Sequence, residues 1–297
     1  MLNLCLIYIP PYMKITCSIN GRAVAKYDAK ISIFDNSLFY ADGLFETLLA
    51  LNGDVIFLDD HLDRLEKGAK LINLTLPVDR STCARWIRKT NLRNSARIKK
   101  VRLTVTAGDS GFWAGRPSKP RIMVIATEYQ LPSEPFRLMV APFRVDQDSP
   151  FRNVKTLSFI IEMTARKHAY QGKFDDAILI NRAGFVAEST SANLFWIKDG
   201  VVCTSPLTSG CLEGMTRKHI LELAAFAGMR TCEKNIRLKD LLKTDEIFVS
   251  SSLKIIIPVT SVTDRKTHRF PIGPVTKYLQ ELLYQRIGLN RYGAPRD

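Results

Sequence analysis

The sequence predicts a two-domain protein of mixed α and β structure, of the α+β or α/β class. Strand and helix patterns alternate in the first half, and a cluster of short strand patterns fills the second half. Residues 128–135 contain two prolines among polar residues, which is typical of a linker. We therefore expect a lead segment at 1–13, an N-terminal α/β domain at 14–127, a linker at 128–135 and a C-terminal domain at 136–297.

Apolar periodicity defines the elements of the first half. A hairpin turn at 52–54 separates two strand patterns, the apolar residues from 59 to 76 recur at helical spacing, and a second helix begins near Ser81. Residues 108–120 are rich in glycine and proline and predict a loop. The expected strands are Ile31–Phe34, Leu44–Leu51, Val55–Leu58, Val101–Thr106 and Arg121–Ala126.

The second half predicts short strands between three helices. The helices are expected from about Ser158 to Gln171, from Thr216 to Gly228 and from Val275 to Tyr284. The expected strands are Phe136–Ala141, Asp176–Asn181, Phe185–Glu188, Asn193–Ile197, Val201–Thr204, Glu246–Ser250 and Ile255–Val259.

The chain is basic, with a formal net charge of +14. Eight of its cations lie between Arg85 and Arg102 with no acidic residue among them, a pattern that suits a nucleic-acid surface. The alternative is the solvated face of an amphipathic helix, which the apolar Trp86 and Ile87 favour. Because no nucleic-acid-binding motif accompanies the run, we expect no nucleic-acid partner.

The six cysteines and four histidines show no metal-ligand spacing, and we predict no metal site. Scattered cysteines in a chain of this size are typical of free thiols in a reducing compartment. No apolar stretch is long enough to span a bilayer, and the first twelve residues make a poor signal peptide. We expect a cytoplasmic protein without a membrane partner.

Lys155 and Glu188 are the candidates for chemistry. Pyridoxal 5'-phosphate requires an amine for its aldehyde carbon and a carboxylate that keeps its ring nitrogen protonated. Lys155 lies just before a predicted helix, and Glu188 begins a run of short hydrogen-bonding residues. The alternatives are a solvated surface lysine and an edge-strand acid paired with a neighbouring base.

Six segments accompany this pair, and together they resemble the class IV aminotransferase family of fold-type IV pyridoxal phosphate enzymes. That family includes branched-chain aminotransferases, D-amino acid aminotransferases and 4-amino-4-deoxychorismate lyases. The resemblance covers about residues 14–288. The segments are Asp42-Gly43-Leu44-Phe45-Glu46-Thr47, His61-Leu62-Asp63-Arg64-Leu65, Lys155-Thr156-Leu157-Ser158, residues 185–195 around Glu188-Ser189-Thr190-Ser191-Ala192-Asn193, Leu212-Glu213-Gly214-Met215-Thr216-Arg217 and residues 247–252.

The resemblance implies a small N-terminal α/β sandwich and a C-terminal pseudo-barrel with the cofactor between them. It implies that Lys155 forms the Schiff base and moves the substrate proton, and that Glu188 contacts the ring nitrogen. It also implies a homodimer. The remaining cofactor-binding residues that it implies are Arg64, Ser189, Asn193, Leu212, Gly214, Met215, Thr216 and Ser252.

Several of these residues have alternative roles. Arg64 is spaced to pair with Asp60 one helical turn away, and Thr216 suits a helix N-cap that would also bind an anion. Phe45, Phe159 and Ser251 are candidates for the substrate side, with plain core packing as the alternative for the two rings. The apolar Leu38-Phe39-Tyr40 suits either a dimer interface or a core strand.

Three departures from the typical motifs bear on the branch of the family. Thr47-Leu48-Leu49 replaces the glycine and arginine typical of branched-chain aminotransferases, Ala107 replaces an arginine typical of D-amino acid aminotransferases, and Glu213 replaces a usual proline. Arg116 is a candidate replacement for that arginine. We expect a transaminase acting on a branched-chain or other apolar α-amino acid and a 2-oxo acid. The alternative is an aminodeoxychorismate lyase that releases pyruvate and 4-aminobenzoate, and the remote one is a basic binding or scaffold protein without activity.

Overall fold

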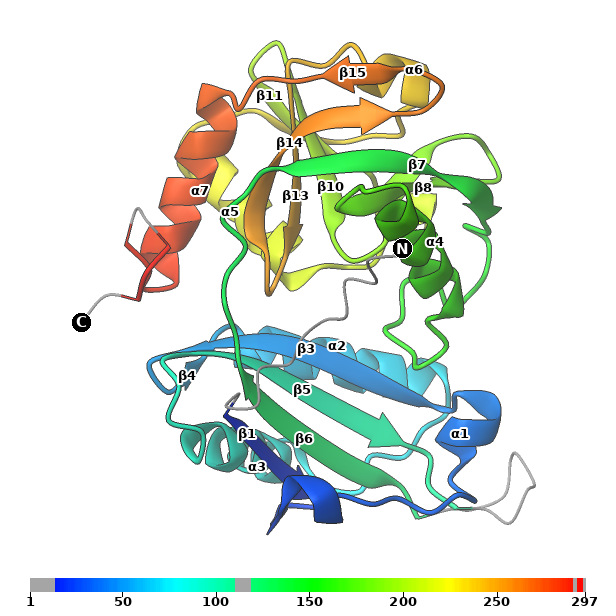
Figure 1. The fold of residues 1–297 in the computed structure, drawn as a ribbon, viewed down its shortest axis with the longest axis vertical. Coiled ribbons are helices and arrows are strands. Elements are labelled where there is room, and N and C mark those ends of the chain that lie inside the picture. The colour runs from blue at the N-terminus through cyan, green and yellow to red at the C-terminus, as the bar shows by residue number, and fades with distance from the viewer. Residues whose placement is uncertain (1–13, 110–118, 291–292, 296–297) are drawn as a thin grey trace, which may run out of the picture.

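The computed structural model describes residues 14–109, 119–290 and 293–295. Within these ranges the chain forms two β-sheets, one from each half of the sequence, with helices packed around them (Figure 1). This arrangement confirms the mixed α/β class with two sheets. The lead segment at 1–13 and Arg116 lie outside the described residues. The domain boundaries stay a prediction.

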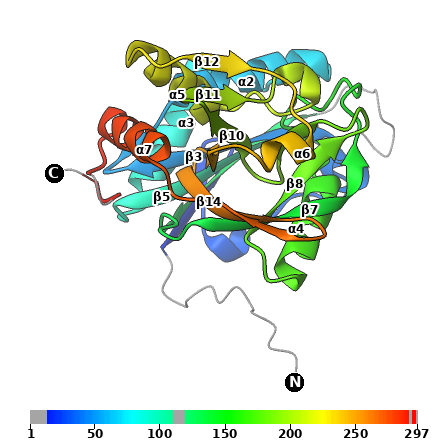
Figure 2. The same ribbon diagram turned by 90° about the horizontal axis from the view of Figure 1, so that it is seen from above.

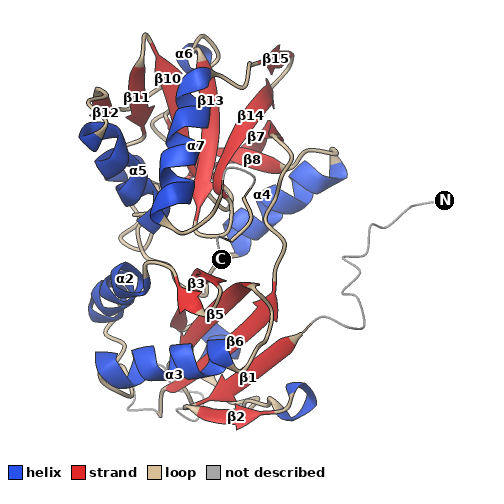
Figure 3. Ribbon diagram, turned by 90° about the vertical axis from the view of Figure 1, so that its left-hand side faces the viewer, coloured by secondary structure: helices blue, strands red, loops and turns tan. Residues whose placement is uncertain are grey.

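The N-terminal sheet has six strands in the order β2-β1-β6-β5-β3-β4. Helices α2 and α3 cover one face of it (Figure 3), and together they bury a core that includes Leu48, Ile87 and Leu103. The elements of this half are β1 (Ile15–Ile19), β2 (Arg22–Val24), the 3-10 turn η1 (Lys26–Asp28), α1 (Asn36–Tyr40), β3 (Gly43–Leu51), β4 (Asp54–Val55), α2 (Leu58–Leu71), α3 (Arg80–Leu92), β5 (Ile98–Thr106) and β6 (Arg121–Glu128).

The basic run of the sequence divides between three environments. Arg85, Arg88 and Lys89 are exposed on α3, which buries Ile87. Lys99 is buried and donates to the carbonyls of two α3-end residues, and alternation along β5 turns Lys100 and Arg102 to the other face of the sheet. The run is therefore an amphipathic helix followed by a strand, not one continuous basic surface.

The C-terminal sheet has nine strands, in the order β12-β11-β10-β13-β14-β7-β8-β9 with β15 paired to β14. β9, at one edge, leads directly into β10, an inner strand, through a tight turn closed by a Ser189–Ala192 bridge, so the sheet curls. The elements are β7 (Phe136–Val145), α4 (Ile160–Gln171), β8 (Asp176–Asn181), β9 (Val186–Ser189), β10 (Asn193–Lys198), β11 (Val201–Thr204), η2 (Leu207–Ser209), α5 (Met215–Phe226), β12 (Thr231–Glu233), α6 (Leu238–Leu241), β13 (Glu246–Ser251), β14 (Ile255–Thr263), β15 (Thr267–Arg269) and α7 (Pro274–Arg286).

Three apolar clusters stabilise this half, and one of them also includes Leu49 and Leu51 of β3. Leu138, Ile178 and Trp196 belong to the cluster inside the curled sheet. Helices α5 and α7 pack together on one outer side and α4 packs on another (Figure 2), each against its own buried cluster. The sequence-predicted pseudo-barrel thus corresponds to a curled sheet with a filled interior.

Two predicted strands are wrong, and several short elements were not predicted. Residues 31–34 form a turn because the apolar run has no buried face: the side chain of Ile33 is 71% exposed. The strand expected at 55–58 ends at Val55, since Phe57 adopts a φ of 53° and α2 begins at Leu58. Strands β1, β2, β12 and β15, helices α1 and α6, and the 3-10 turns η1 and η2 were not predicted. Residues 38–40 belong to α1 and are exposed, so the core-strand alternative for them is wrong.

Within the described ranges, no helix is both long and apolar enough to cross a membrane. The same residues contain no group of three or more His, Cys, Asp or Glu side chains arranged to hold a metal ion. The cytoplasmic location stays a prediction.

Candidate active site

A cavity of about 940 Å³ lies between the two sheets. Among the described residues, its wall contains all those that the sequence singled out as catalytic, cofactor-binding or substrate-facing. These residues are Phe45, Arg64, Lys155, Phe159, Glu188, Ser189, Asn193, Leu212, Gly214, Met215, Thr216, Ser251 and Ser252. The structure therefore brings together residues that lie up to about two hundred positions apart, which supports one shared site without assigning a role to any of them.

Lys155 lies in the loop between β7 and α4. Its backbone carbonyl accepts a hydrogen bond of 3.0 Å from Phe45 N–H, which ties the loop to the start of β3. Its Nζ lies 4.4 Å from the ring centre of Phe45 and 5.6 Å from that of Phe159. Burial, aided by the Arg64 charge, lowers the pKa of Lys155 to about 8. An amine with this pKa is unprotonated far more often at neutral pH than an ordinary lysine.

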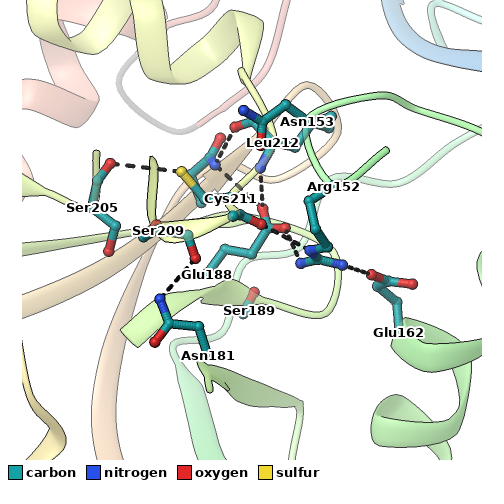
Figure 4. Close-up of polar contacts among 12 residues, drawn as sticks. Arg152, Asn153, Glu162, Asn181, Glu188, Ser189, Ser205, Ser209, Cys211 and Leu212 are labelled. Atoms are coloured by element: carbon teal, nitrogen blue, oxygen red, sulfur yellow. Dashed lines mark hydrogen bonds and ion pairs between the residues drawn. The ribbon is translucent and has the colours of Figure 1, made fainter. Parts of the chain in front are cut away.

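Glu188 lies near the end of β9 with its carboxylate in a polar pocket (Figure 4). Oε1 accepts from Arg152 at 3.1 Å, and Oε2 accepts from the Leu212 N–H at 3.1 Å and from Asn193 at 3.4 Å. Arg152 is shared with Glu162. Burial raises the pKa of Glu188 to about 7 against the lowering effect of Arg152. With this pKa, both the neutral and the ionised forms of Glu188 are populated near neutral pH. A cation placed beside the carboxylate would therefore favour the ionised form.

Arg64 is held from behind by Glu46, which has a 1% exposed side chain. Its Nε and Nη2 donate to the two Glu46 oxygens at 2.8 and 2.6 Å, and Nη1 donates to the Glu213 carbonyl at 2.7 Å. The predicted alternative for Arg64 is wrong, because Asp60 pairs with Lys218 and His219 of α5. The fixed guanidinium is thus a preorganised cation at the cavity wall.

Helix α5 begins at Met215 beside Arg64, with Gly214 as its N-cap. Thr216 is therefore the second helical residue, and its predicted capping role is wrong. A Cβ on Gly214 would lie 1.9 Å from Asn193 Oδ1, so only glycine fits against this side chain. The first N–H groups of a twelve-residue helix and the nearby guanidinium favour an anion at this place.

The Glu213 side chain does not oppose that anion site. Its carboxylate is 40% exposed and lies 3.7 Å from Lys67 Nζ, while only its backbone carbonyl contacts Arg64. The departure from the usual proline therefore does not point a negative charge at Arg64. The hydroxyl of Ser252 completes this region and lies 3.2 Å from His61 Nε2.

Four residues near the site carry interactions that the sequence did not assign. Glu46 and His61 were seen only as members of motifs, yet they form a buried 2.6 Å contact behind Arg64. Arg152 precedes Lys155 by three residues, and this proximity is the one sequence feature that could have pointed to its place in the site. Arg102 lies with its guanidinium carbon 3.5 Å from the ring centre of Phe45, and alternation along β5 was its only signal.

The comparisons with known proteins agree with this geometry. A family model described as amino-transferase class IV matches residues 43–262, so the chain belongs to the class IV aminotransferases, which are pyridoxal 5'-phosphate enzymes. It is 33% identical over 272 residues to a Methanocaldococcus jannaschii protein assigned provisionally as a branched-chain-amino-acid aminotransferase, covering 89% of this chain and 93% of that one.

Two further similarities show how the family divides. The chain is 29% identical over 275 residues to the aminodeoxychorismate lyase of Bacillus subtilis, covering 90% of this chain and 93% of the lyase. Its structure is similar, with a TM-score of 0.86 and 25% identity, to a branched-chain aminotransferase from Thermoproteus uzoniensis solved with norvaline, covering 92% and 95% of the two chains. The fold is therefore that of fold-type IV enzymes.

Proposed function

We propose that this chain is a pyridoxal 5'-phosphate-dependent aminotransferase that moves the amino group of a branched-chain or other apolar α-amino acid to a 2-oxo acid. The observation that carries the proposal is a single cavity lined by the Lys155 amine, the Glu188 carboxylate and an anion site at Arg64 and the start of α5. An amine, a carboxylate and an anion site suit the aldehyde, ring nitrogen and phosphate of this cofactor.

Lys155 and Glu188 carry the chemistry in this proposal. When bound, the cofactor supplies an aldehyde that condenses with amines and a ring that withdraws electrons from the substrate α-carbon. The Lys155 amine, with its pKa near 8, would hold the cofactor's aldehyde carbon and would serve as the base for the proton of that α-carbon. Glu188 would hold a proton on the ring nitrogen, and its carboxylate is available for this because its Arg152 partner is shared with Glu162.

The cofactor phosphate is proposed to bind Arg64, the N–H groups of Met215 and Thr216, and the Ser252 hydroxyl. Glu46 occupies the Nε and Nη2 edge of the guanidinium, so that edge is fixed away from the anion. Leu212 lies on the cavity wall where a ring face would pack, with its N–H already committed to Glu188. Ser189 supports the turn after Glu188, since its hydroxyl donates to Asp176.

The substrate side of the cavity combines apolar and cationic residues. Phe45, Phe159 and Ile161 provide the apolar surface that suits a leucine-like side chain, and Ser251 provides a hydroxyl. Lys100 and Arg102 also line the cavity and suit a substrate that carries a second carboxylate. This observation favours the aminodeoxychorismate lyase as the second candidate, although a dicarboxylic 2-oxo acid acceptor would use the same cations.

We propose a homodimer for the assembled enzyme. Exposed apolar side chains lie on and just before α1, with Leu38 60% exposed and Ile33 71% exposed. Sedimentation of the wild type and of Leu38→Asp tests this assembly. A dimer that the substitution weakens supports it, and a wild-type monomer at working concentration contradicts it.

The activity test supplies three substrate sets to the cofactor-loaded protein. We expect glutamate from L-leucine and 2-oxoglutarate. Release of 4-aminobenzoate and pyruvate from aminodeoxychorismate instead establishes the lyase. Formation of glutamate from a D-amino acid and 2-oxoglutarate establishes an aminotransferase for D-amino acids. A protein that binds no cofactor and converts none of the three contradicts the proposal.

A further inference from the structure

Asp176, the first residue of β8, is fully buried and organises the turn that follows Glu188. The three successive hydroxyls of this turn all donate to its carboxylate: Ser189 at 3.1 Å, Ser191 at 2.8 Å, and Thr190. The backbone N–H of Ala177 donates as well, at 2.8 Å. One carboxylate therefore collects the polar groups of the segment that connects Glu188 to Asn193.

Lys254 reaches the same carboxylate from another loop. Its Nζ lies 3.1 Å from Asp176 Oδ2 and also donates to Ser191, although the two charged residues are 78 positions apart. Lys254 is 9% exposed and ends the segment from β13 to β14 that carries Ser251 and Ser252. Its own N–H donates to the Ser251 hydroxyl at 3.3 Å. The ion pair thus joins the loop beneath Glu188 to the loop that carries the proposed phosphate hydroxyl.

The Lys254 loop needs such an anchor because its backbone is strained. Ile255, the next residue, adopts a φ of 61°, a conformation that β-branched residues rarely adopt. Strain of this kind persists only where surrounding contacts fix the conformation. Ile255 is buried, and the Lys254–Asp176 contact holds the residue before it.

We propose that Asp176 and Lys254 form a positioning pair that holds the Glu188–Asn193 turn and the Ser251–Lys254 segment in the relative arrangement that pyridoxal 5'-phosphate binding requires. The proposal rests on the proposed function, and it assigns neither residue to the chemistry. The pair acts through Ser189, Ser191 and Ser251. Removing one partner leaves the other charge buried without compensation, whereas removing both does not, so the two substitutions are expected to be strongly non-additive.

The test measures the Kd of the full-length protein for pyridoxal 5'-phosphate by equilibrium dialysis, together with the thermal midpoint of the cofactor-free protein. The forms compared are wild type, Asp176→Asn, Lys254→Met and the double variant. We expect each single substitution to weaken binding by about tenfold or more and the double variant to bind more tightly than the product of the two effects. The matched control is Asp245→Asn, which breaks an exposed 3.1 Å pair with Lys198 outside the cavity wall and leaves the Kd unchanged.

The outcomes separate the two proposals. A wild type that binds no cofactor overturns both the proposed function and the positioning pair. A wild type that binds, with single variants that fold and bind equally well, overturns the pair alone. Single variants with a lower thermal midpoint but an unchanged Kd show a purely structural role and also overturn it. Where the single variants do not fold, Ser191→Ala, which removes the bridging hydroxyl and keeps both charges, is expected to weaken binding, and an unchanged Kd contradicts the proposal.

Discussion

Glu46 and Glu188 are both buried glutamates near the cavity, yet their surroundings differ in one respect. Glu46 accepts three hydrogen bonds of 2.6–2.8 Å from Arg64 and His61, while Glu188 accepts three longer ones of 3.1–3.4 Å, and the arginine among its donors is shared with Glu162. Burial raises the pKa of both; the donors around Glu46 overcome it and hold that pKa well below its usual range, whereas the pKa of Glu188 stays near 7. The hydrogen-bond donors around each carboxylate, not its burial, therefore decide whether its pKa is low, as for Glu46, or near neutral, as for Glu188.

The largest expected effect comes from Lys155. The charges of Glu46 and Glu188 both raise its pKa, against the larger lowering effect of burial. Lys155→Ala removes the base and the attachment point, and we expect the rate of amino transfer to fall by about 10²–10⁴-fold or more. Steady-state kinetics with the preferred substrate pair measures this loss. Lys67→Ala, at a 69% exposed position, serves as the control and should keep full activity. Activity close to wild type in the Lys155 variant would remove that residue from the mechanism.

Glu46→Gln tests the carboxylate that pairs with Arg64. It leaves the Arg64 guanidinium partly buried without its anion, and we expect the free energy of unfolding to fall by about 3–5 kcal/mol. Urea denaturation of the cofactor-free protein measures the change. The control is Glu66→Gln, whose carboxylate forms an exposed 3.3 Å pair with Arg80 and should contribute less than about 1 kcal/mol. Equal losses in the two variants would contradict the proposed role of Glu46.

The two glutamates also predict opposite pH dependences. The pKa of Glu188 is raised from 4.5 to about 7, so the folded state keeps a proton that the unfolded state loses. Stability of the cofactor-free protein should therefore fall by about 3 kcal/mol between these two pH values because of Glu188. The depressed pKa of Glu46 acts the other way, and its contribution is lost as pH falls below 4.5. Denaturation of wild type and Glu188→Gln across this pH range measures the loss of stability that is due to Glu188. Identical stability profiles for the two proteins would refute it.

Glu188→Gln tests the proposed role of the Glu188 carboxylate directly. The amide fills the same space without the negative charge, so we expect folding to be retained while kcat falls by about 10²-fold. The pH dependence of the bound cofactor's absorbance should change as well, because the variant no longer stabilises a protonated ring nitrogen. A variant with unchanged kcat would place that role elsewhere.

Glu213→Gln sharpens the comparison with the smallest effect. This carboxylate points to solvent, and only its backbone carbonyl contacts Arg64. We expect stability to change by less than about 0.5 kcal/mol and the Kd for pyridoxal 5'-phosphate to stay within about twofold. A large gain in cofactor affinity would show that the acid does repel the phosphate.

The sequence predicted the family and those cavity-lining residues that belong to contiguous motifs. It assigned Glu46 no role, because that role depends on where His61 and Arg64 lie on α2 after folding. Asp176 was seen only as the start of a strand, since its four side-chain donors come from two distant segments. A carboxylate's partners across a fold leave no local pattern in the chain.

The secondary-structure errors have a similar cause. The apolar residues of 31–34 predicted a strand, but the structure leaves Ile33 exposed, and burial there is decided by what packs against the segment. Thr216 has the right residue type for an N-cap, but close packing of Gly214 against Asn193 starts α5 two residues earlier.

The central claim is that Lys155 attaches the cofactor in the cavity between the sheets. Incubation of the full-length protein with pyridoxal 5'-phosphate, reduction with borohydride, proteolysis and mass spectrometry tests it directly. We predict that the cofactor's mass appears on the peptide that contains Lys155 and is absent from Lys155→Ala. Modification of other lysines only, or equal labelling of wild type and variant, would contradict the account.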